Sequence, residues 1–210
     1  MIILGLTGSI GMGKSVAAKH FRRLGIPIHD ADRAVHNILA HDKEAIRAVE
    51  KLFPKAVKKG AVDREAVAKL VFGDPEALLL IEELLHPLVR ARERTFLECA
   101  ARRVCKLVIL DVPLLFETGG ETRCDGVITV SAPAFLQRQR VLRRPGMTKE
   151  RLASILARQT PDVEKRRRSD FVVLTGLGRD FGLRQIQNIV RITGEWAGAK
   201  WPPKPVIRGT

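Results

Sequence analysis

The residues with the most specific chemistry stand near the amino terminus, where the run Gly8 to Ser15 fits the pattern G-x-x-x-x-G-K-S. Its glycines, Gly8, Gly11 and Gly13, let backbone N–H groups come close to phosphate oxygens, an approach that side chains would obstruct. Lys14 can reach the β- and γ-phosphates of a nucleoside triphosphate, and Ser15 can offer its hydroxyl to Mg²⁺. The run therefore predicts a phosphate cradle.

The sequence on either side supplies the elements that such a cradle needs. The apolar run Ile2 to Leu6 predicts a buried strand, and the stretch from Lys14 to Leu24 has apolar residues at helical spacing. The amino terminus of that helix adds a favourable dipole for anions. A chance glycine turn would not be expected to have both flanking elements. A dinucleotide-binding loop does not fit, because its fingerprint has a further glycine where Lys14-Ser15-Val16 stand here.

Carboxylates follow two further predicted strands. Asp30 and Asp32 come directly after a short strand predicted at residues 26–29, and Asp111 lies near the end of another at 107–112. The carboxyl ends of parallel strands meet at one edge of a sheet, so these side chains are expected beside the phosphate loop. A kinase that phosphorylates an alcohol needs a carboxylate to orient and deprotonate the hydroxyl. Asp32 fits that role, although either Asp30 or Asp32 could instead cap the following helix.

Strands and helices alternate along the chain. The predicted strands lie near residues 2–7, 26–29, 107–112, 126–131 and 171–174. This alternation predicts an α/β fold, a P-loop NTPase-type doubly wound parallel sheet of about five strands. Asp63, Asp74 and Thr148 are predicted helix N-caps.

The remaining segments complete one predicted kinase domain over residues 1–196. The helical pattern at 33–104 predicts an inserted substrate lobe, and its apolar face is expected to include Leu78, Ile81, Leu84 and Leu85. A helical lid is predicted at 138–160 and a closing helix at 179–196. Residues 197–210 are expected to form a flexible C-terminal tail.

The charge of the chain is concentrated in one segment. The net charge is +14, and residues 138–168 hold eleven Lys and Arg against three acidic residues, which gives +8. Such a block can meet nucleic acid, a membrane surface or the phosphates of small substrates. Readers of single-stranded nucleic acid interleave aromatic residues with the basic ones, but aromatics only flank this block, at Phe135 and Phe171. Small phosphate ligands are therefore favoured, and many of the arginines are expected on solvated helix faces.

Cysteine usage and hydropathy predict a cytoplasmic protein. The three cysteines, Cys99, Cys105 and Cys124, are odd in number and have no C-x-x-C spacing. We expect no secretory leader, because no basic start is followed by a long apolar segment. No apolar run approaches the roughly 20 residues that span a bilayer, so no membrane partner is expected.

Five segments, taken together and in order, resemble the dephospho-coenzyme A kinase family over about residues 1–195. They are the phosphate loop, Asp30-Ala31-Asp32, Leu85-His86-Pro87-Leu88, Pro113-Leu114-Leu115-Phe116-Glu117 and the arginine-rich stretch from Gln139 to Gln159. Their joint occurrence is far more specific than the phosphate loop alone. The resemblance implies ATP-dependent phosphorylation of the ribose 3′-hydroxyl of dephospho-coenzyme A, the last step of coenzyme A synthesis. ATP and dephospho-coenzyme A are then the partners and Mg²⁺ the cofactor.

The resemblance also implies roles for individual residues. Asp32 would be the base for the 3′-hydroxyl, and Asp30 and Asp111 would support metal or water together with Ser15. The acceptor pocket would include His86 and Glu117, although His86 before a proline could equally pack or cap at a helix end. The residues implied to contact ATP are Gly8, Gly11, Met12, Gly13, Lys14, Ser15 and Val16, with Arg140 and Arg144 as the lid cations.

Three departures from the family pattern bear on these roles. Val16 stands where many members have threonine, which leaves the metal hydroxyl of Ser15 in place. Leu174-Thr175-Gly176 replaces an acidic or asparagine-containing run, which puts side-chain contacts to adenine there in question. The lid holds four closely spaced arginines, Arg138, Arg140, Arg143 and Arg144, so the pattern does not decide which one enters the site.

Two other functions are consistent with parts of the sequence. A nucleoside or nucleoside-monophosphate kinase would share the sheet and the lid and would differ in acceptor. A basic nucleic-acid-binding ATPase would need a base-reading surface, and a switch protein would need an N-K-x-D motif; neither is visible. We therefore expect no nucleic-acid partner and a monomer or a weak homo-oligomer.

Overall fold

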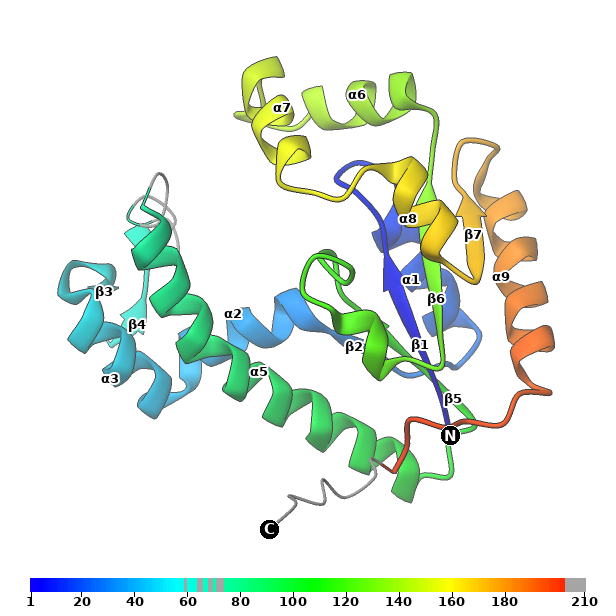
Figure 1. The fold of residues 1–210 in the computed structure, drawn as a ribbon, viewed down its shortest axis with the longest axis horizontal. Coiled ribbons are helices and arrows are strands. Elements are labelled where there is room, and N and C mark those ends of the chain that lie inside the picture. Colours follow the sequence, from blue (N-terminus) through cyan, green and yellow to red (C-terminus); the bar gives the residue numbers. More distant parts are fainter. Residues whose placement is uncertain (59, 64–65, 68–69, 71–73, 203–210) are drawn as a thin grey trace, which may run out of the picture. The chain divides into compact units, whose positions relative to one another are not determined.

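The buried apolar runs form one five-stranded sheet in the computed structural model, which describes residues 1–58, 60–63, 66–67, 70 and 74–202 (Figure 1). The strands stand in the order β2-β5-β1-β6-β7. Strand β1 pairs in parallel with β5 on one side and β6 on the other, and β6 pairs in parallel with β7. This arrangement confirms the predicted α/β class with a parallel sheet.

The strand bounds lie close to the predicted ones. They are Ile2–Thr7 for β1, Ile28–Asp30 for β2, Leu107–Asp111 for β5, Gly126–Ser131 for β6 and Phe171–Leu174 for β7. The difference is largest at β2, which begins two residues after the predicted start at Ile26 and ends at Asp30. Every residue of β1, β5 and β6 is buried, as expected for strands covered on both faces.

One face of the sheet packs against helices α1 (Lys14–Arg23) and α9 (Arg179–Thr193), which contact each other. Alternate strand residues supply this core, because side chains along a strand point to opposite faces. The cluster contains Ile2, Leu4, Leu6, Ala17, Ala18, Phe21, Leu107, Ile109, Ile128, Val130, Val173, Ile186 and Ile189. The amphipathic stretch predicted after the phosphate loop is therefore the inner face of α1.

Three further helices follow β6 and lie between the last two strands of the sheet in sequence (Figure 1). They are α6 (Ala134–Leu142), α7 (Lys149–Ala157) and α8 (Asp162–Arg168). Thr148 caps α7, as predicted, by accepting a hydrogen bond from the Arg151 amide. Helix α8 has no apolar stripe and was not predicted. Its residue Lys165 offers a backbone carbonyl to the Thr129 hydroxyl of β6.

Residues 30–99 form a second compact unit with its own core. It contains α2 (Ala31–His41), α3 (Lys43–Leu52), most of α5 (Pro75–Arg102) and the short 3₁₀ helix η1 (Pro54–Ala56). A hairpin of β3 (Val57–Lys58) and β4 (Ala61–Val62) was not predicted, because two-residue strands carry no readable alternation.

The predicted caps and apolar face of this unit are present where the structure describes them. Asp63 accepts from the Ala66 amide and Asp74 from the Ala77 amide, which confirms both as caps. Ile81, Leu84 and Leu85 belong to the core of the unit. The side chain of Leu78 lies outside the described residues.

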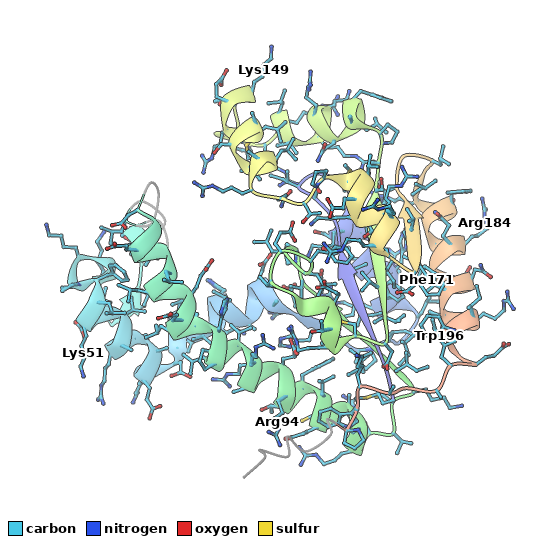
Figure 2. All side chains as sticks on the ribbon, viewed as in Figure 1. Lys51, Arg94, Lys149, Phe171, Arg184 and Trp196 are labelled. Carbon is cyan, nitrogen blue, oxygen red and sulfur yellow. The ribbon has the colours of Figure 1, made fainter. Side chains whose placement is uncertain are left out.

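The segment after α9 differs from the loose tail predicted at 197–210. The backbone amides of Ala199 and Lys200 donate to Oδ1 of Asp125 at 2.6 and 3.0 Å, while its Oδ2 accepts from the Ile3 amide. Just before it, Trp196 stacks on Phe171 with ring centroids 5.5 Å apart (Figure 2). Residues 203–210 lie outside the described part of the chain. For Ala199 and Lys200 the prediction of a loose tail is wrong, because Asp125, which binds their amides, stands more than 70 positions away in sequence.

Along the described residues, no helix combines the length and apolarity needed to cross a membrane. Of the three cysteines, Cys99 is exposed, Cys105 is half-buried and Cys124 is buried.

His20, inside the core between α1 and its neighbours, makes the stability of the protein sensitive to acid. The ring is 5% exposed, and neither of its nitrogens has a hydrogen-bond partner among the described residues. Burial, helped by the charge of Arg23, lowers the pKa of His20 below its ordinary value of 6.5. As the pH falls through 6.5, the unfolded chain takes up this proton before the native chain does, so the free energy of unfolding decreases.

We therefore expect His20→Leu to remove part of the acid sensitivity. Urea unfolding of wild type and variant at pH 7.5 and 5.5 measures the difference, because the other histidines contribute equally to both proteins. The wild type should lose more stability between the two pH values than the variant. Equal losses would show that His20 titrates alike in the folded and unfolded chains.

Candidate active site

The phosphate loop joins the end of β1 to the start of α1 and has the backbone conformation that phosphate binding requires. Gly13, the N-cap of α1, has a φ of 96°, and Gly11 has a φ of 77°. A Cβ on Gly13 would come within 2.8 Å of the Thr175 hydroxyl, and one on Gly11 within 2.5 Å of Val141. Only glycine combines these φ values with such close packing against Val141 and Thr175.

The side chains predicted to bind phosphates and metal differ in their exposure to solvent. Ser15 and Val16, at the start of α1, are exposed, and Met12 is buried with its sulfur near the Ala132 amide. Lys14 donates to Oδ1 of Asp111 at a distance of 2.5 Å. Asp111 is 4% exposed, so the ammonium group is its compensating charge. The end of β5 therefore fixes the direction of the phosphate-loop lysine.

Arg140 on α6 connects the lid to the phosphate loop. Its guanidinium donates to the carbonyl of Gly11 at 3.4 Å and to both the hydroxyl and the carbonyl of Thr175, at 3.0 and 2.9 Å. The Thr175 hydroxyl in turn donates to the Met12 carbonyl. Of the two predicted lid cations, Arg140 thus contacts the loop, whereas Arg144 is exposed and its role stays a prediction.

Two glutamines, which the sequence did not single out, hold one residue of the loop. The Ile10 amide donates to Oε1 of Gln159 at 3.1 Å, and Nε2 of Gln137 donates to the Ile10 carbonyl at 2.8 Å. Gln137 comes from α6 and Gln159 from the end of the lid. A side-chain amide has both a donor and an acceptor, so glutamines can satisfy a backbone group of either kind.

Glu117, predicted in the acceptor pocket, forms an ion pair within the same unit. Its Oε1 accepts from Nζ of Lys165 at 2.9 Å and from the Thr160 amide at 2.7 Å. Burial alone would raise the pKa of Glu117, but the hydrogen bonds from Lys165 and Thr160 outweigh it and hold the pKa below 4.5. The carboxyl is therefore ionised at neutral pH. A contact between Glu117 and the acceptor stays a prediction.

Asp30, Asp32 and His86 belong to the second unit. Asp30 caps α2 by accepting from the Arg33 amide at 3.0 Å, so the capping alternative holds for this residue. Asp32 is exposed in the first turn of α2, with its carboxylate free of the capping role. His86 is exposed inside α5, eleven residues after the start of the helix, so its interpretation as a helix-end residue is wrong.

The residues at the loop fit a magnesium ion that is bound together with phosphates. Among the described residues, no three His, Cys, Asp or Glu side chains gather as a ligand set. Mg²⁺ in kinase sites is usually held by few protein oxygens and keeps water and substrate phosphates as its other ligands. The exposed hydroxyl of Ser15 and the carboxylate of Asp111 suit that mode of binding.

A phosphate loop between β1 and α1, a buried carboxylate on the neighbouring strand and a helix, α6, that brings an arginine to the loop are typical of a kinase of the P-loop class. The family model described as dephospho-CoA kinase matches residues 2–177. The dephospho-CoA kinase of Paramagnetospirillum magneticum is 60% identical over 166 residues, 79% of this chain and 78% of that protein. That of Rhodospirillum rubrum is 57% identical over 187 residues, 89% of each chain. The chain belongs to the dephospho-CoA kinase family.

Solved structures agree with this assignment. The crystal structure of TT1252 from Thermus thermophilus is 38% identical, with a TM-score of 0.80 over 91% of this chain and 96% of that one. Dephospho-CoA kinase from Campylobacter jejuni is 25% identical, with a TM-score of 0.70 over the same shares. A shikimate kinase from Acinetobacter baumannii, 17% identical with a TM-score of 0.52 over 91% of this chain and 92% of that one, shares the fold.

Proposed function

We propose that this chain transfers the γ-phosphoryl group of ATP to the ribose 3′-hydroxyl of dephospho-coenzyme A, giving coenzyme A and ADP. This reaction is the final step of coenzyme A biosynthesis. The observation that carries the proposal is the phosphate loop, with Gly11 and Gly13 at positive φ and Lys14 against Asp111, in a member of the dephospho-CoA kinase family. In the transfer, the bond from the 3′-oxygen to the γ-phosphorus forms while the bond to the β–γ bridging oxygen breaks.

The phosphate loop and the lid are the elements that would bind ATP. Within the proposed ATP contact run from Gly11 to Val16, the backbone amides of Gly13, Lys14 and Ser15 would donate to the β-phosphate, and the dipole of α1 favours its charge. The amides of Met12 and Val16 instead donate to the carbonyls of Ser9 and Gly13. The ammonium group of Lys14 has three donors, so it can keep its bond to Asp111 and also reach phosphate oxygens. Arg140, already at the carbonyl of Gly11, supplies a second cation for the charge of the transferring group.

Mg²⁺ would be held by Ser15, with Asp111 in direct or water-mediated contact, and Asp30 is the third predicted contributor. When bound, the ion neutralises charge on the β- and γ-phosphates.

Residues of the second unit would bind the acceptor and take the proton of its hydroxyl. Asp32 stands two positions after the last residue of β2, and its exposed carboxylate can accept the proton of the 3′-hydroxyl. His86 would contribute to acceptor binding from α5. The orientation of the hydroxyl by Asp32 reduces the entropy lost on reaching the transition state.

The proposal includes a cytoplasmic location, in keeping with cysteines that are odd in number and have no C-x-x-C spacing. ATP and dephospho-coenzyme A are its small-molecule partners. Mg²⁺ is its cofactor.

Product analysis tests the proposal directly. Purified protein with ATP and Mg²⁺ is given dephospho-coenzyme A, adenosine, a nucleoside monophosphate or no acceptor, and ADP release and phosphorylated product are measured. We expect ADP and coenzyme A in equal amounts with dephospho-coenzyme A alone. Turnover with another acceptor instead would retain the kinase class and reject the substrate. Release of ADP at the same rate without acceptor would reject the transfer reaction.

A further inference from the structure

A buried ion pair between Lys165 and Glu117 lies just after the lid, and the transfer step proposed above assigns it no role. The side chain of Lys165 is completely buried, and its Nζ donates to Oε1 of Glu117 and to the Pro113 carbonyl, at 2.9 and 3.3 Å. The same carbonyl accepts from the Thr7 hydroxyl at the end of β1. A lysine without any exposure requires a compensating charge. Lys165, which is also bound to the Pro113 carbonyl, therefore fixes the position of the Glu117 carboxylate.

Glu117 in turn accepts a hydrogen bond from the Thr160 amide and so holds the backbone at the end of the lid. Thr160 follows Gln159 directly, and Oε1 of Gln159 accepts from the Ile10 amide in the phosphate loop. Both residues are half-buried, and each of these two contacts joins segments that lie far apart in sequence. Glu117 thus holds the backbone at Thr160, and the side chain of the preceding residue, Gln159, contacts the phosphate loop.

We propose that Glu117 is a positioning residue for ATP binding. By holding the Thr160 amide, it sets the Gln159 side chain on Ile10 and so stabilises the phosphate-binding conformation of the loop. Lys165 keeps the carboxylate of Glu117 ionised and in place. This inference rests on the proposed kinase function and extends it to residues that act through the conformation of the phosphate loop.

The alternative role of Glu117, a contact with dephospho-coenzyme A, makes an opposite prediction. Its Oε1 is committed to Lys165 and Thr160, and its Oε2 is buried with no hydrogen-bond partner among the described residues. A positioning residue changes the affinity for ATP. An acceptor contact changes the KM for dephospho-coenzyme A and leaves ATP affinity unchanged.

A matched pair of double variants isolates the single hydrogen bond on which the proposal depends. Glu117→Met with Lys165→Met removes both charges and leaves the Thr160 amide without an acceptor. Glu117→Gln with Lys165→Met also removes both charges but retains a carbonyl oxygen for that amide. Replacing both members of a buried pair avoids a stranded charge, so both proteins are expected to fold.

The measurement is equilibrium binding of ATP without acceptor, followed by KM and kcat with dephospho-coenzyme A. The methionine pair should bind ATP about three- to tenfold more weakly, the effect of losing one ordinary hydrogen bond. The glutamine pair should bind ATP nearly as the wild type does. Gln159→Leu should reproduce the loss, and its combination with the methionine pair should add nothing further. Gln187→Leu, an exposed glutamine of α9, is the control and should bind as wild type.

Several outcomes would overturn the proposal. They are an unchanged ATP affinity in Gln159→Leu, equal losses in the two double variants, additive losses in the combination, and a rise confined to the KM for dephospho-coenzyme A. If the methionine pair does not fold, Gln159→Leu still decides. Because ATP binding is measured without acceptor, a wild type that binds ATP but does not phosphorylate dephospho-coenzyme A would reject the proposed function and leave this inference testable.

Discussion

Replacement of Asp32 by asparagine is expected to lower kcat by about 10² to 10⁴, the usual contribution of a general base. Asparagine keeps the size of the side chain and can still accept a hydrogen bond, but it cannot take the proton of the 3′-hydroxyl. Asp32 is exposed in the first turn of α2 and does not cap the helix, so the fold should change little. The affinity for ATP should remain close to that of the wild type, because Asp32 is proposed to act on the acceptor hydroxyl and not on the phosphates of ATP.

The measurement is kcat and KM for both substrates, with ATP binding determined separately. Glu44→Gln is the matched control, since Glu44 is an exposed acid in the first turn of α3, and its loss has the same effect on a helix dipole. The control should retain wild-type turnover. A near-normal kcat in Asp32→Asn would remove Asp32 from the base role, and a large loss of ATP affinity would point to a different function for this carboxylate.

The architecture of the sheet could be predicted because its information is local. Continuous apolar runs such as Leu107 to Leu110 predict strands buried on both faces, and the alternation of strands with helices predicts parallel pairing. Caps such as Thr148 could be predicted for the same reason, since a cap contacts an amide three residues away. The exposed, highly charged helix α8 has no such local pattern, and it was missed.

The contacts that organise the site could not be predicted, because they join residues that are distant in sequence. Gln137 and Gln159 meet Ile10 across well over a hundred positions, and no motif marks a glutamine for this contact. Lys165 stands in a run of basic residues where a solvated face was expected, yet its side chain is completely buried. Thr175, noted as a departure from the family pattern, contacts Arg140 and Met12 in this structure. Residue type alone therefore predicts the chemistry of the candidate site and leaves its supporting contacts unknown.

Lys14 is the residue whose loss should affect both ATP binding and transfer. Lys14→Met removes the cation nearest the β- and γ-phosphates, and we expect kcat/KM for ATP to fall by at least about a hundredfold. Binding of ATP without acceptor should weaken as well, since the charge also acts on the bound ground state. Lys19→Met, an exposed lysine on the same helix, is the control for the loss of one positive charge and should keep its activity. Unchanged kinetics in Lys14→Met would refute the phosphate cradle.

Loss of the ion pair with Asp111 also lowers the stability of the protein, and this effect must be separated from the effect on phosphoryl transfer. Asp111 is 4% exposed, so Lys14→Met removes the ammonium group beside a buried carboxylate and should destabilise the fold. Adding Asp111→Asn removes the charge of that carboxylate, and urea unfolding should show most of the lost stability restored. Transfer should stay lost in the double variant, because neither the phosphate cation nor the Asp111 carboxylate is present. Recovery of both stability and turnover would mean that Lys14 serves only to neutralise Asp111, whereas recovery of stability alone assigns the remaining loss to phosphoryl transfer, to which Lys14 and the Asp111 carboxylate are both proposed to contribute.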